Sequence, residues 1–425
     1  MLVDILGYTI ILPLLPFYSE RLGASPFVVG LLISTYAICQ LVSGPIIGSL
    51  SDRAGRRPLL IVSQMGTLLG FLILSQATAL WLIFVSRVID GLTAGNLSLA
   101  QAYIADVTEP NKRAQSFGVI GIAFGLGFLV GPAVSGFLAG FGYAYPIYAA
   151  ALLSTTSIVC TWTLLPQATP GQPRGSAGET GPAGRRLGLL EWSGYVEYFR
   201  RPGLRELLLE FFLFALCFSS FTSGFALFAE RRFTWHGQSF GAKQVGYIFA
   251  YVGFLGVILQ GGLIGRLVKW LGEPKLVKSG FLCTAIGYAC LGFIHGIPEL
   301  LGISAVASYG TGVVRPAVTS LITQKASKRE QGVVLGLTQS LTSIAQIVAP
   351  LLSGFLIGRS WLAAWALVAG GIAFCGFLLS AAPRVSTVGC LTVLGETSRR
   401  FNTTVTEPRL SRSGCHCKST LNGVR

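Results

Sequence analysis

A short charged stretch lies between two long apolar runs, residues 27–50 and residues 58 to about 79. It reads Gly48-Ser-Leu-Ser-Asp52-Arg53-Ala-Gly55-Arg56-Arg57-Pro58. Four charged side chains this close together cannot lie in hydrocarbon, so the sequence predicts a tight turn at the water interface between two membrane-spanning helices. The three arginines place this turn on the cytoplasmic side. We expect Asp52 to accept hydrogen bonds at a helix N-terminus and Arg56 to be available for another carboxylate.

The composition extends this prediction to the whole chain. Of 425 residues, 52% are hydrophobic and 12% are charged, about half the charged fraction of a soluble domain. Several apolar runs exceed the length needed to cross a bilayer. We therefore predict an all-α, multi-pass membrane protein with both termini in the cytoplasm and twelve transmembrane helices, at about 1–18, 28–50, 58–77, 80–104, 116–140, 144–166, 204–229, 243–267, 275–294, 298–323, 332–357 and 361–382.

The two halves of the chain repeat each other. Residues 130–140 recur as residues 348–358, with Gly131-Pro132 matched by Ala349-Pro350, and Gly48 and Gly55 are echoed by Gly265 and Gly272. Two six-helix pseudo-repeats follow, a construction known among transporters. The predicted parts are a six-helix bundle at 1–166, a cytoplasmic linker at 167–203 with an amphipathic interfacial helix near 187–199, a second bundle at 204–382, and a disordered cytoplasmic tail at 383–425.

The net charge of +15 does not indicate a nucleic-acid partner. Most of the Lys and Arg residues fall in the predicted cytoplasmic loops and the tail, so the charge encodes membrane topology. Cys415-His416-Cys417 is only a weak metal candidate because a fourth ligand is missing, and we predict no metal site. The first span is short and carries Asp4 where a helix should still be entering the bilayer, so we expect about ten residues of this helix to precede Met1.

Ionisable groups inside spans are candidates for function because they are costly there. Asp4 lies one helical turn before Tyr8, and a carboxylate in low-dielectric surroundings is suited to carry a proton. Arg87 and Asp90 lie on one helix face and can pair with each other or with Asp4, which would make protonation depend on geometry. The alternatives are an inert interfacial Asp4 and a purely structural Arg87–Asp90 pair.

Asp106 ends the fourth span at the cytoplasm, where it can pair with Arg56 to form a gate that holds in one conformation and breaks in another.

In the fifth span, glycines allow close helix packing and Pro132 is expected to kink the helix. Arg315 either lines a cavity and favours an anionic or electron-rich substrate group, or snorkels to the cytoplasm. Phenylalanines stripe the seventh span and face lipid, the core or a flat apolar substrate. The cavity candidates are Tyr8, Asn96, Gln101, Glu210, Phe218, Gln260 and Arg315.

No enzyme site emerges, because the chain lacks a Walker A loop and the H-E-x-x-H and G-x-S-x-G motifs. We therefore predict a transporter that uses no cofactor other than the proton as coupling ion. Its partners are expected to be a small-molecule substrate and the lipid bilayer, and it is expected to act as a monomer.

The Gly48–Pro58 stretch resembles the loop between the second and third helices of the major facilitator superfamily. Together with Asp4, Arg87 and Gly91, residues 102–106 and Gly131-Pro132, residues 1–382 resemble its drug:proton antiporters, most of all the tetracycline:proton antiporters. The resemblance implies an antiporter motif at Gly127, Gly131, Pro132 and Gly136, and proton coupling by Asp4, Arg87 and Asp90. It implies a cytoplasmic gate formed by Gly48, Asp52, Arg53, Gly55, Arg56, Arg57 and Asp106.

The resemblance implies export of small amphipathic drugs by alternating access across an inner membrane. Tetracycline antiporters carry a His near Gly256 and an Asp near Thr284, and both are absent here, which puts tetracycline itself in doubt as the substrate. A proton-coupled importer of a sugar or metabolite and a non-transporting receptor or scaffold on the same fold stay open as alternatives.

Overall fold

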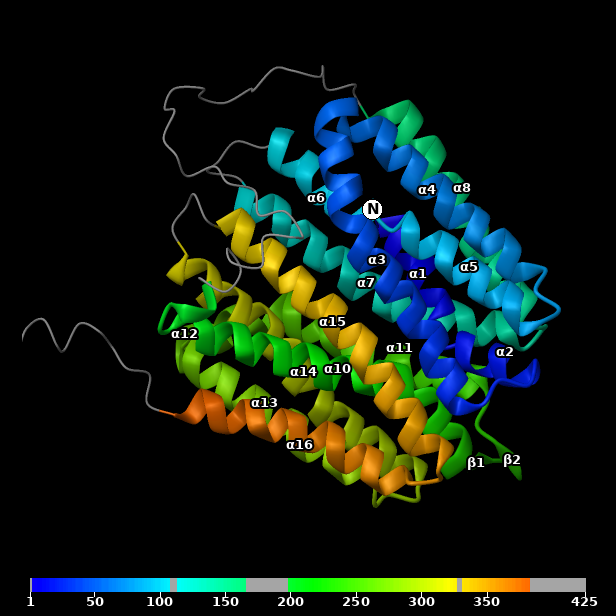
Figure 1. The fold of residues 1–425 in the computed structure, drawn as a ribbon. Helices are drawn as coiled ribbons and strands as arrows, with labels where there is room; N and C mark the ends of the chain where they lie inside the picture. The colour runs from blue at the N-terminus through cyan, green and yellow to red at the C-terminus, as the bar shows by residue number, and fades with distance from the viewer. Residues whose placement is uncertain (1, 108–112, 166–197, 327–330, 383–425) are drawn as a thin grey trace, which may run out of the picture. The chain divides into compact units, whose positions relative to one another are not determined.

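The computed structural model describes residues 2–107, 113–165, 198–326 and 331–382, which are almost entirely helical (Figure 1). Most of the expected interfacial helix, the tail and the 415–417 metal candidate lie outside these residues. The elements are α1 (Leu2–Ile11), α2 (Leu15–Arg21), α3 (Pro26–Ala54), α4 (Arg56–Ser75), α5 (Leu80–Leu92), α6 (Asn96–Val107), α7 (Arg113–Ala139), α8 (Ala144–Leu164), α10 (Leu204–Arg232), β1 (Thr234–Trp235), β2 (Gln238–Ser239), α11 (Ala242–Ile258), the π-helical turn η1 (Leu259–Leu263), α12 (Ile264–Leu271), α13 (Glu273–Leu291), α14 (Ile297–Lys325), α15 (Gln331–Gly358) and α16 (Leu362–Ala381).

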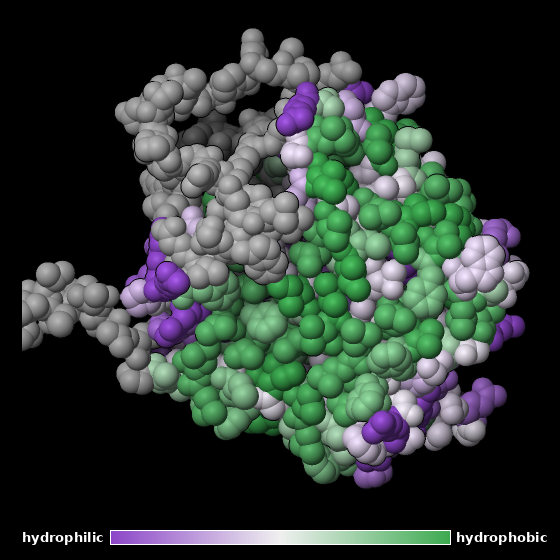
Figure 2. Space-filling model, viewed as in Figure 1, coloured by the Kyte–Doolittle hydropathy of each residue, from purple (hydrophilic) through white to green (hydrophobic). Residues whose placement is uncertain are grey.

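Each predicted span coincides with one helix or with helices that continue one another. Among the described residues, ten such segments are long and apolar enough to cross a membrane. The other two predicted spans fall on α7, with a shorter apolar part at Ala123–Ala139, and on α13. Figure 2 shows the outer surface of these helices as a broad hydrophobic face with hydrophilic residues gathered towards its edges. The short β1–β2 hairpin was not predicted.

The charged stretch at 48–58 is helical almost throughout, which corrects the prediction of a tight turn. Helix α3 continues to Ala54 and α4 begins at Arg56, so the chain reverses at Gly55 alone, with a φ of 95°. Only glycine adopts this φ without strain. Asp52 therefore lies in the last turn of α3 and does not open the next helix. Gly272, at the repeat-related position, joins α12 to α13 with a φ of 73°.

Two of the spans are broken where the sequence removes helical hydrogen bonds. The first span breaks between α1 and α2 beside Pro13, and Pro16 has no N–H to bond the carbonyl of Leu12. The fourth breaks between α5 and α6, where Ser63 of α4 stabilises the exposed backbone. Its hydroxyl accepts a hydrogen bond from the N–H of Gly95 at 2.9 Å and donates to the carbonyl of Thr93.

Two helix crossings bring backbone against backbone, and they are related by the repeat. Helix α3 packs on α15, and α11 packs on α7. A Cβ added to Gly30 would lie 2.3 Å from the carbonyl oxygen of Pro350, and one added to Gly246 would lie 2.5 Å from that of Pro132. Real Cβ atoms do not approach backbone this closely, so only glycine fits at these two positions.

The predicted antiporter motif lies on α7 between two neighbouring helices. A Cβ on Gly127 or Gly131 would collide with Ile5 or Thr9 of α1, at 2.5 Å and 2.0 Å. Pro132 and Gly136 instead face α11, where a Cβ on Gly136 would lie 2.8 Å from the carbonyl of Lys243. The motif thus clamps α7 between α1 and α11.

We call the end of the helices that carries Glu20 and Arg231 the Glu20 end, and the opposite end the Arg56 end. The crossings are tight at the Glu20 end and loose at the Arg56 end. Gly48 follows Gly30 by about five turns at 3.6 residues per turn and so lies on the same face of α3. A Cβ on Gly48 would meet nothing within 4 Å, and the same holds for Gly336, about five turns before Gly354 on α15. The two helices therefore diverge towards the Arg56 end.

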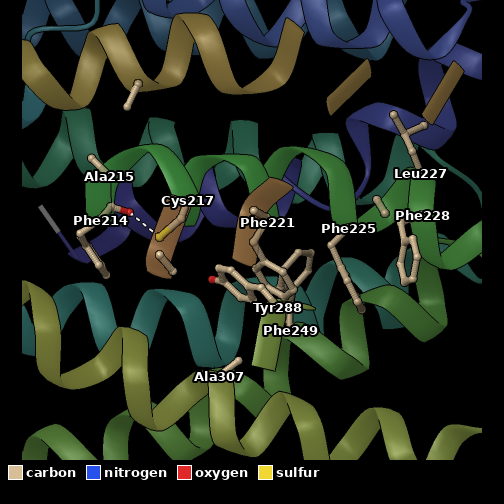
Figure 3. Close-up of a cluster of buried hydrophobic side chains, with 14 of the residues drawn as sticks. Phe214, Ala215, Cys217, Phe221, Phe225, Leu227, Phe228, Phe249, Tyr288 and Ala307 are labelled. Atoms are coloured by element: carbon tan, nitrogen blue, oxygen red, sulfur yellow. Dashed lines mark hydrogen bonds between the residues drawn. The ribbon is translucent and has the colours of Figure 1, made fainter. Parts of the chain in front are cut away.

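The later part of the phenylalanine stripe of α10 is structural (Figure 3). Phe221 stacks on Tyr288 of α13 at 4.9 Å between ring centroids and meets Phe249 of α11 edge to face at 6.0 Å. Phe225 packs on Phe249 at 5.4 Å. These rings pack α10, α11 and α13 into one core. The earlier phenylalanines of the stripe do not take part in these contacts.

The crossings generate a first prediction. Gly246→Ala should lower the stability of the folded protein by about 1–3 kcal/mol, because its methyl group overpacks rigid backbone. Gly256→Ala, on the same helix, is the matched control, since a Cβ there meets nothing within 4 Å and alanine favours the helix. The midpoints of thermal unfolding in detergent check this, and equal midpoints for the two variants would contradict it.

Candidate functional site

A cavity of about 680 Å³ lies among helices from both halves of the chain. This volume is all of the empty space along the lining, and it includes open solvent. Its polar side chains are Tyr8 of α1, Tyr36 of α3, Arg87 and Asp90 of α5, Ser219, Thr222 and Ser223 of α10, and Gln346 of α15, and apolar residues complete the wall. The cavity therefore combines an apolar lining with a few polar groups that can orient a ligand.

The Arg87–Asp90 pair lies on the cavity wall and is nearly buried. Arg87 Nη1 is 3.3 Å from Asp90 Oδ2, and each side chain is 6% exposed. Arg87 Nη2 also donates to the hydroxyl of Ser86 at 3.2 Å, and Ser86 in turn donates to the carbonyl of Gly70 at 2.8 Å. Arg87 Nε has no hydrogen-bond acceptor among the described residues. One buried donor of this arginine is therefore unsatisfied within the described part of the chain.

Asp4 is half-buried on α1, one turn from the cavity residue Tyr8. Its carboxylate oxygens accept from Gln64 Nε2 of α4 at 3.4 Å and 3.5 Å. The same amide donates to the hydroxyl of Ser157 of α8 at 2.9 Å. Asp4 is thus held among α1, α4 and α8, whereas Arg87 forms its ion pair with Asp90.

A second cavity of about 350 Å³ adjoins the first and shares Ser219, Thr222 and Gln346 with it. Phe211, Phe214 and Phe218 of α10 line it, and the rings of Phe214 and Phe218 stack at 5.8 Å. Arg315 of α14 is also on its wall, with Cζ 5.6 Å from the ring centroid of Phe124. The structure therefore places Phe218 and Arg315 together, as two sides of one space.

The remaining cavity candidates lie elsewhere. Asn96 begins α6 and its Nδ2 is 3.5 Å from Thr67 Oγ1. Glu210 is fully buried on α10 and does not line either cavity. Gln260 lies in the π-helical turn with its side chain exposed, again outside both linings. The side chain of Gln101 is outside the described part of the chain.

The predicted gate lies at the Arg56 end. Arg56 Nη1 donates to the hydroxyl of Ser51, and Arg57 Nη2 donates to the carbonyl of Trp162 of α8, while the Arg53 side chain is exposed. The side chains of Asp52 and Asp106 are not described, so the Arg56–Asp106 pair stays a prediction.

Two sets of residues were missed by the sequence-based prediction. Ser219, Thr222 and Ser223 recur at three- and four-residue spacing on α10, which marks one polar helix face, but the phenylalanine stripe drew attention away from it. At the Glu20 end, Arg231 Nη2 of α10 lies 2.6 Å from Glu20 Oε1 of α2 and Nη1 lies 3.3 Å from Glu230 Oε2. This contact joins the two halves of the chain where the crossings are tight.

The described residues contain no group of three His, Cys, Asp or Glu side chains that could hold a metal ion. The charged groups on the two cavity walls are Arg87, Asp90 and Arg315. Such a site can exchange a proton and bind a charged or polar ligand.

Comparison with known proteins gives consistent matches over most of the chain. The family model of the Major Facilitator Superfamily matches residues 1–279 and 262–389. The class B tetracycline resistance protein of Escherichia coli is 30% identical, over 84% of this chain and 87% of its own length. Multidrug resistance protein 2 of Bacillus subtilis is 28% identical, over 83% of this chain and 86% of its own length. The crystal structure of the human organic anion transporter MFSD10 (TETRAN) is similar with a TM-score of 0.68 and 26% identity, covering 89% of this chain and 96% of that one.

The buried ion pair generates a second prediction. Asp90→Asn should destabilise the protein by about 3–5 kcal/mol, because it leaves the Arg87 charge without its partner. The double variant Arg87→Gln with Asp90→Asn removes both charges and should unfold at a higher temperature than Asp90→Asn alone. Thermal unfolding in detergent measures both, and a double variant no more stable than the single one would refute the pair's role.

The contact at the Glu20 end generates a third prediction. Glu20→Gln or Arg231→Gln should favour the conformation that is open at this end, by up to about 1 kcal/mol for a partly exposed ion pair. The measurement is labelling of a cysteine placed at the cavity residue Ile33, with an impermeant maleimide applied from the Glu20 side, in a background whose accessible native cysteines have been replaced. The charge swap Glu20→Arg with Arg231→Glu should restore slow labelling, and unchanged labelling in the single variants would oppose the prediction.

Proposed function

The chain belongs to the Major Facilitator Superfamily, and we propose that within this family of membrane transporters it is a proton-coupled antiporter that exports small amphipathic compounds by alternating access. The relatives support this proposal by their names, since they are tetracycline and multidrug resistance proteins. Their sequence identity to this chain is 28–30% and extends over more than four fifths of it.

One observation carries the proposal, namely the nearly buried Arg87–Asp90 pair on the wall of a cavity that helices from both halves of the chain line. A charged pair in this position is costly to maintain and is typically kept for function. Protonation of Asp90 would weaken its attraction to Arg87, and Arg87 would then turn towards water or substrate. The pair thus links the charge of one carboxyl group to the geometry of the cavity wall.

Asp4 is proposed to pass protons to this pair. It is half-buried on the helix that also carries Tyr8 and is joined by Gln64 to α4 and α8. A change in its charge therefore alters how three helices are held together. A route from Asp4 past Tyr8 would bring the proton to the cavity.

The side of the membrane from which the cavity is open is inferred from the Arg56 end and the Glu20 end of the helices. By the positive-inside rule, the Arg56 end faces the cytoplasm, and both chain termini are then cytoplasmic. The crossings close the Glu20 end, and the glycine faces of α3 and α15 separate towards the Arg56 end. The described conformation is therefore proposed to be the one that loads substrate from the cytoplasm, with Glu20 and Arg231 holding the outer side shut.

The substrate is proposed to be a compound other than tetracycline itself. Thr284, where tetracycline antiporters carry an acid nearby, is fully buried and donates to the carbonyl of Gly280 at 2.9 Å. A Cβ on Gly310 would lie 2.2 Å from its hydroxyl oxygen, so the position serves helix packing and not the cavity.

The experiment is transport by the purified protein in liposomes with an imposed pH gradient. Asp4→Asn should abolish gradient-driven efflux of a fluorescent drug while leaving the protein folded, because Asp4 is only half-buried and asparagine keeps its shape. Asp4→Glu is the matched control, since it retains the carboxyl group. Substrate movement in the same direction as the protons would favour an importer, and retained coupling in Asp4→Asn would remove Asp4 from the mechanism.

A further inference from the structure

Arg315 is a cation on the wall of the second cavity, and no described residue neutralises its charge. None of its guanidinium N–H groups donates a hydrogen bond to a described residue, and it has no ion pair there. Glu210 of α10 is fully buried and outside the cavity lining. The other cavity arginine, Arg87, already has Asp90 as a partner at 3.3 Å.

The position of Arg315 leaves its hydrogen-bonding edge available. Cζ of the guanidinium lies over the ring of Phe124 at 5.6 Å from its centroid, which is a cation–π distance. The side chain is exposed to the cavity. A planar guanidinium held by one face presents N–H donors that fit the oxygens of a carboxylate, sulfonate or phosphate.

The opposite side of this cavity is aromatic. Phe214 and Phe218 are stacked, and Phe218 meets Phe128 of α7 edge to face at 6.3 Å. The space shared with the larger cavity is bordered by Ser219, Thr222 and Gln346, which are neutral hydrogen-bonding groups. The cavity thus offers aromatic contacts from α10 and a cation from Arg315 to an aromatic ring that carries a negative group.

We propose that Arg315 binds the anionic group of the transported compound and that the substrates of this protein are aromatic organic anions. This inference rests on the proposed transport function and narrows its substrate class. It also has a consequence for the transport cycle, because exchanging one proton for one monovalent anion moves two positive charges inward per turnover. Transport of the anion is then more strongly driven by the membrane potential than transport of a neutral compound.

The test uses three probes that share one ring system, namely naphthalene-2-sulfonate, its neutral analogue naphthalene-2-sulfonamide, and (2-naphthylmethyl)trimethylammonium. The wild-type protein in detergent should bind the sulfonate most tightly and the cation least tightly. Arg315→Gln should raise the Kd of the sulfonate at least about tenfold, as expected for loss of a hydrogen-bonded charge partner, and should change that of the sulfonamide little. Arg315→Lys should give an intermediate Kd because it keeps the charge and loses the planar donors.

Arg359→Gln is the matched control. Arg359 is also held over aromatic rings, at 4.5 Å from Phe355 and 5.5 Å from Trp361, but it lies in the turn between α15 and α16 and not on a cavity wall. It should leave all three Kd values unchanged. Retained sulfonamide binding by Arg315→Gln shows that the variant is folded.

Two results would overturn the inference, namely an unchanged sulfonate Kd in Arg315→Gln, and wild-type binding of the cation as tight as that of the sulfonate. The proposed function is tested separately by proton flux in liposomes. If the cation or the sulfonamide drives proton movement while the sulfonate does not, the antiporter stands and the anionic substrate class falls.

Discussion

The structure depends on two places where a glycine meets the carbonyl oxygen of a proline on a neighbouring helix. Gly30 against Pro350 and Gly246 against Pro132 bring α3 to α15 and α11 to α7 at backbone contact. Each crossing joins a helix of the first half to a helix of the second, so the two halves are held by surfaces that carry almost no side-chain volume. Such surfaces can separate and re-form without repacking a core, which suits an interface that must open and close.

The position of the crossings explains where the charged groups lie. Helices α3 and α15 are in backbone contact at Gly30 and Pro350, and the first cavity is lined about one turn further along them, by Ile33 and Gln346. Arg87, Asp90 and Arg315 open onto this space. In hydrocarbon, charges are tolerated where water or a partner reaches them. The two adjoining cavities together bring three charged side chains and the phenylalanines of α10 to one part of the described helices.

The fold was largely predictable from the sequence, because apolar runs of bilayer length leave few alternatives to spanning helices. The helical breaks and the continuation of α3 through Asp52 to Ala54 were not predicted, since a charged motif at the water interface can be helical or extended with equal ease. The site was predicted in part. Intramembrane charge identified Arg87, Asp90 and Arg315, but the neutral groups Tyr36 and Gln346 carry no comparable feature, and their roles follow only from how the helices pack.

The two cavity arginines differ in whether an acid balances their charge, and this difference bears on how the membrane potential contributes to transport. The charge of Arg87 is balanced by Asp90, whereas Arg315 has no ion-pair partner in the described part of the chain. Moving one elementary charge across the membrane is worth about 2.3 kcal/mol per 100 mV. Exchange of a proton for an anion moves two charges, so the potential contributes about twice that amount. An exporter with an unbalanced arginine in its cavity therefore gains most from the potential when its substrate is the ion that balances it.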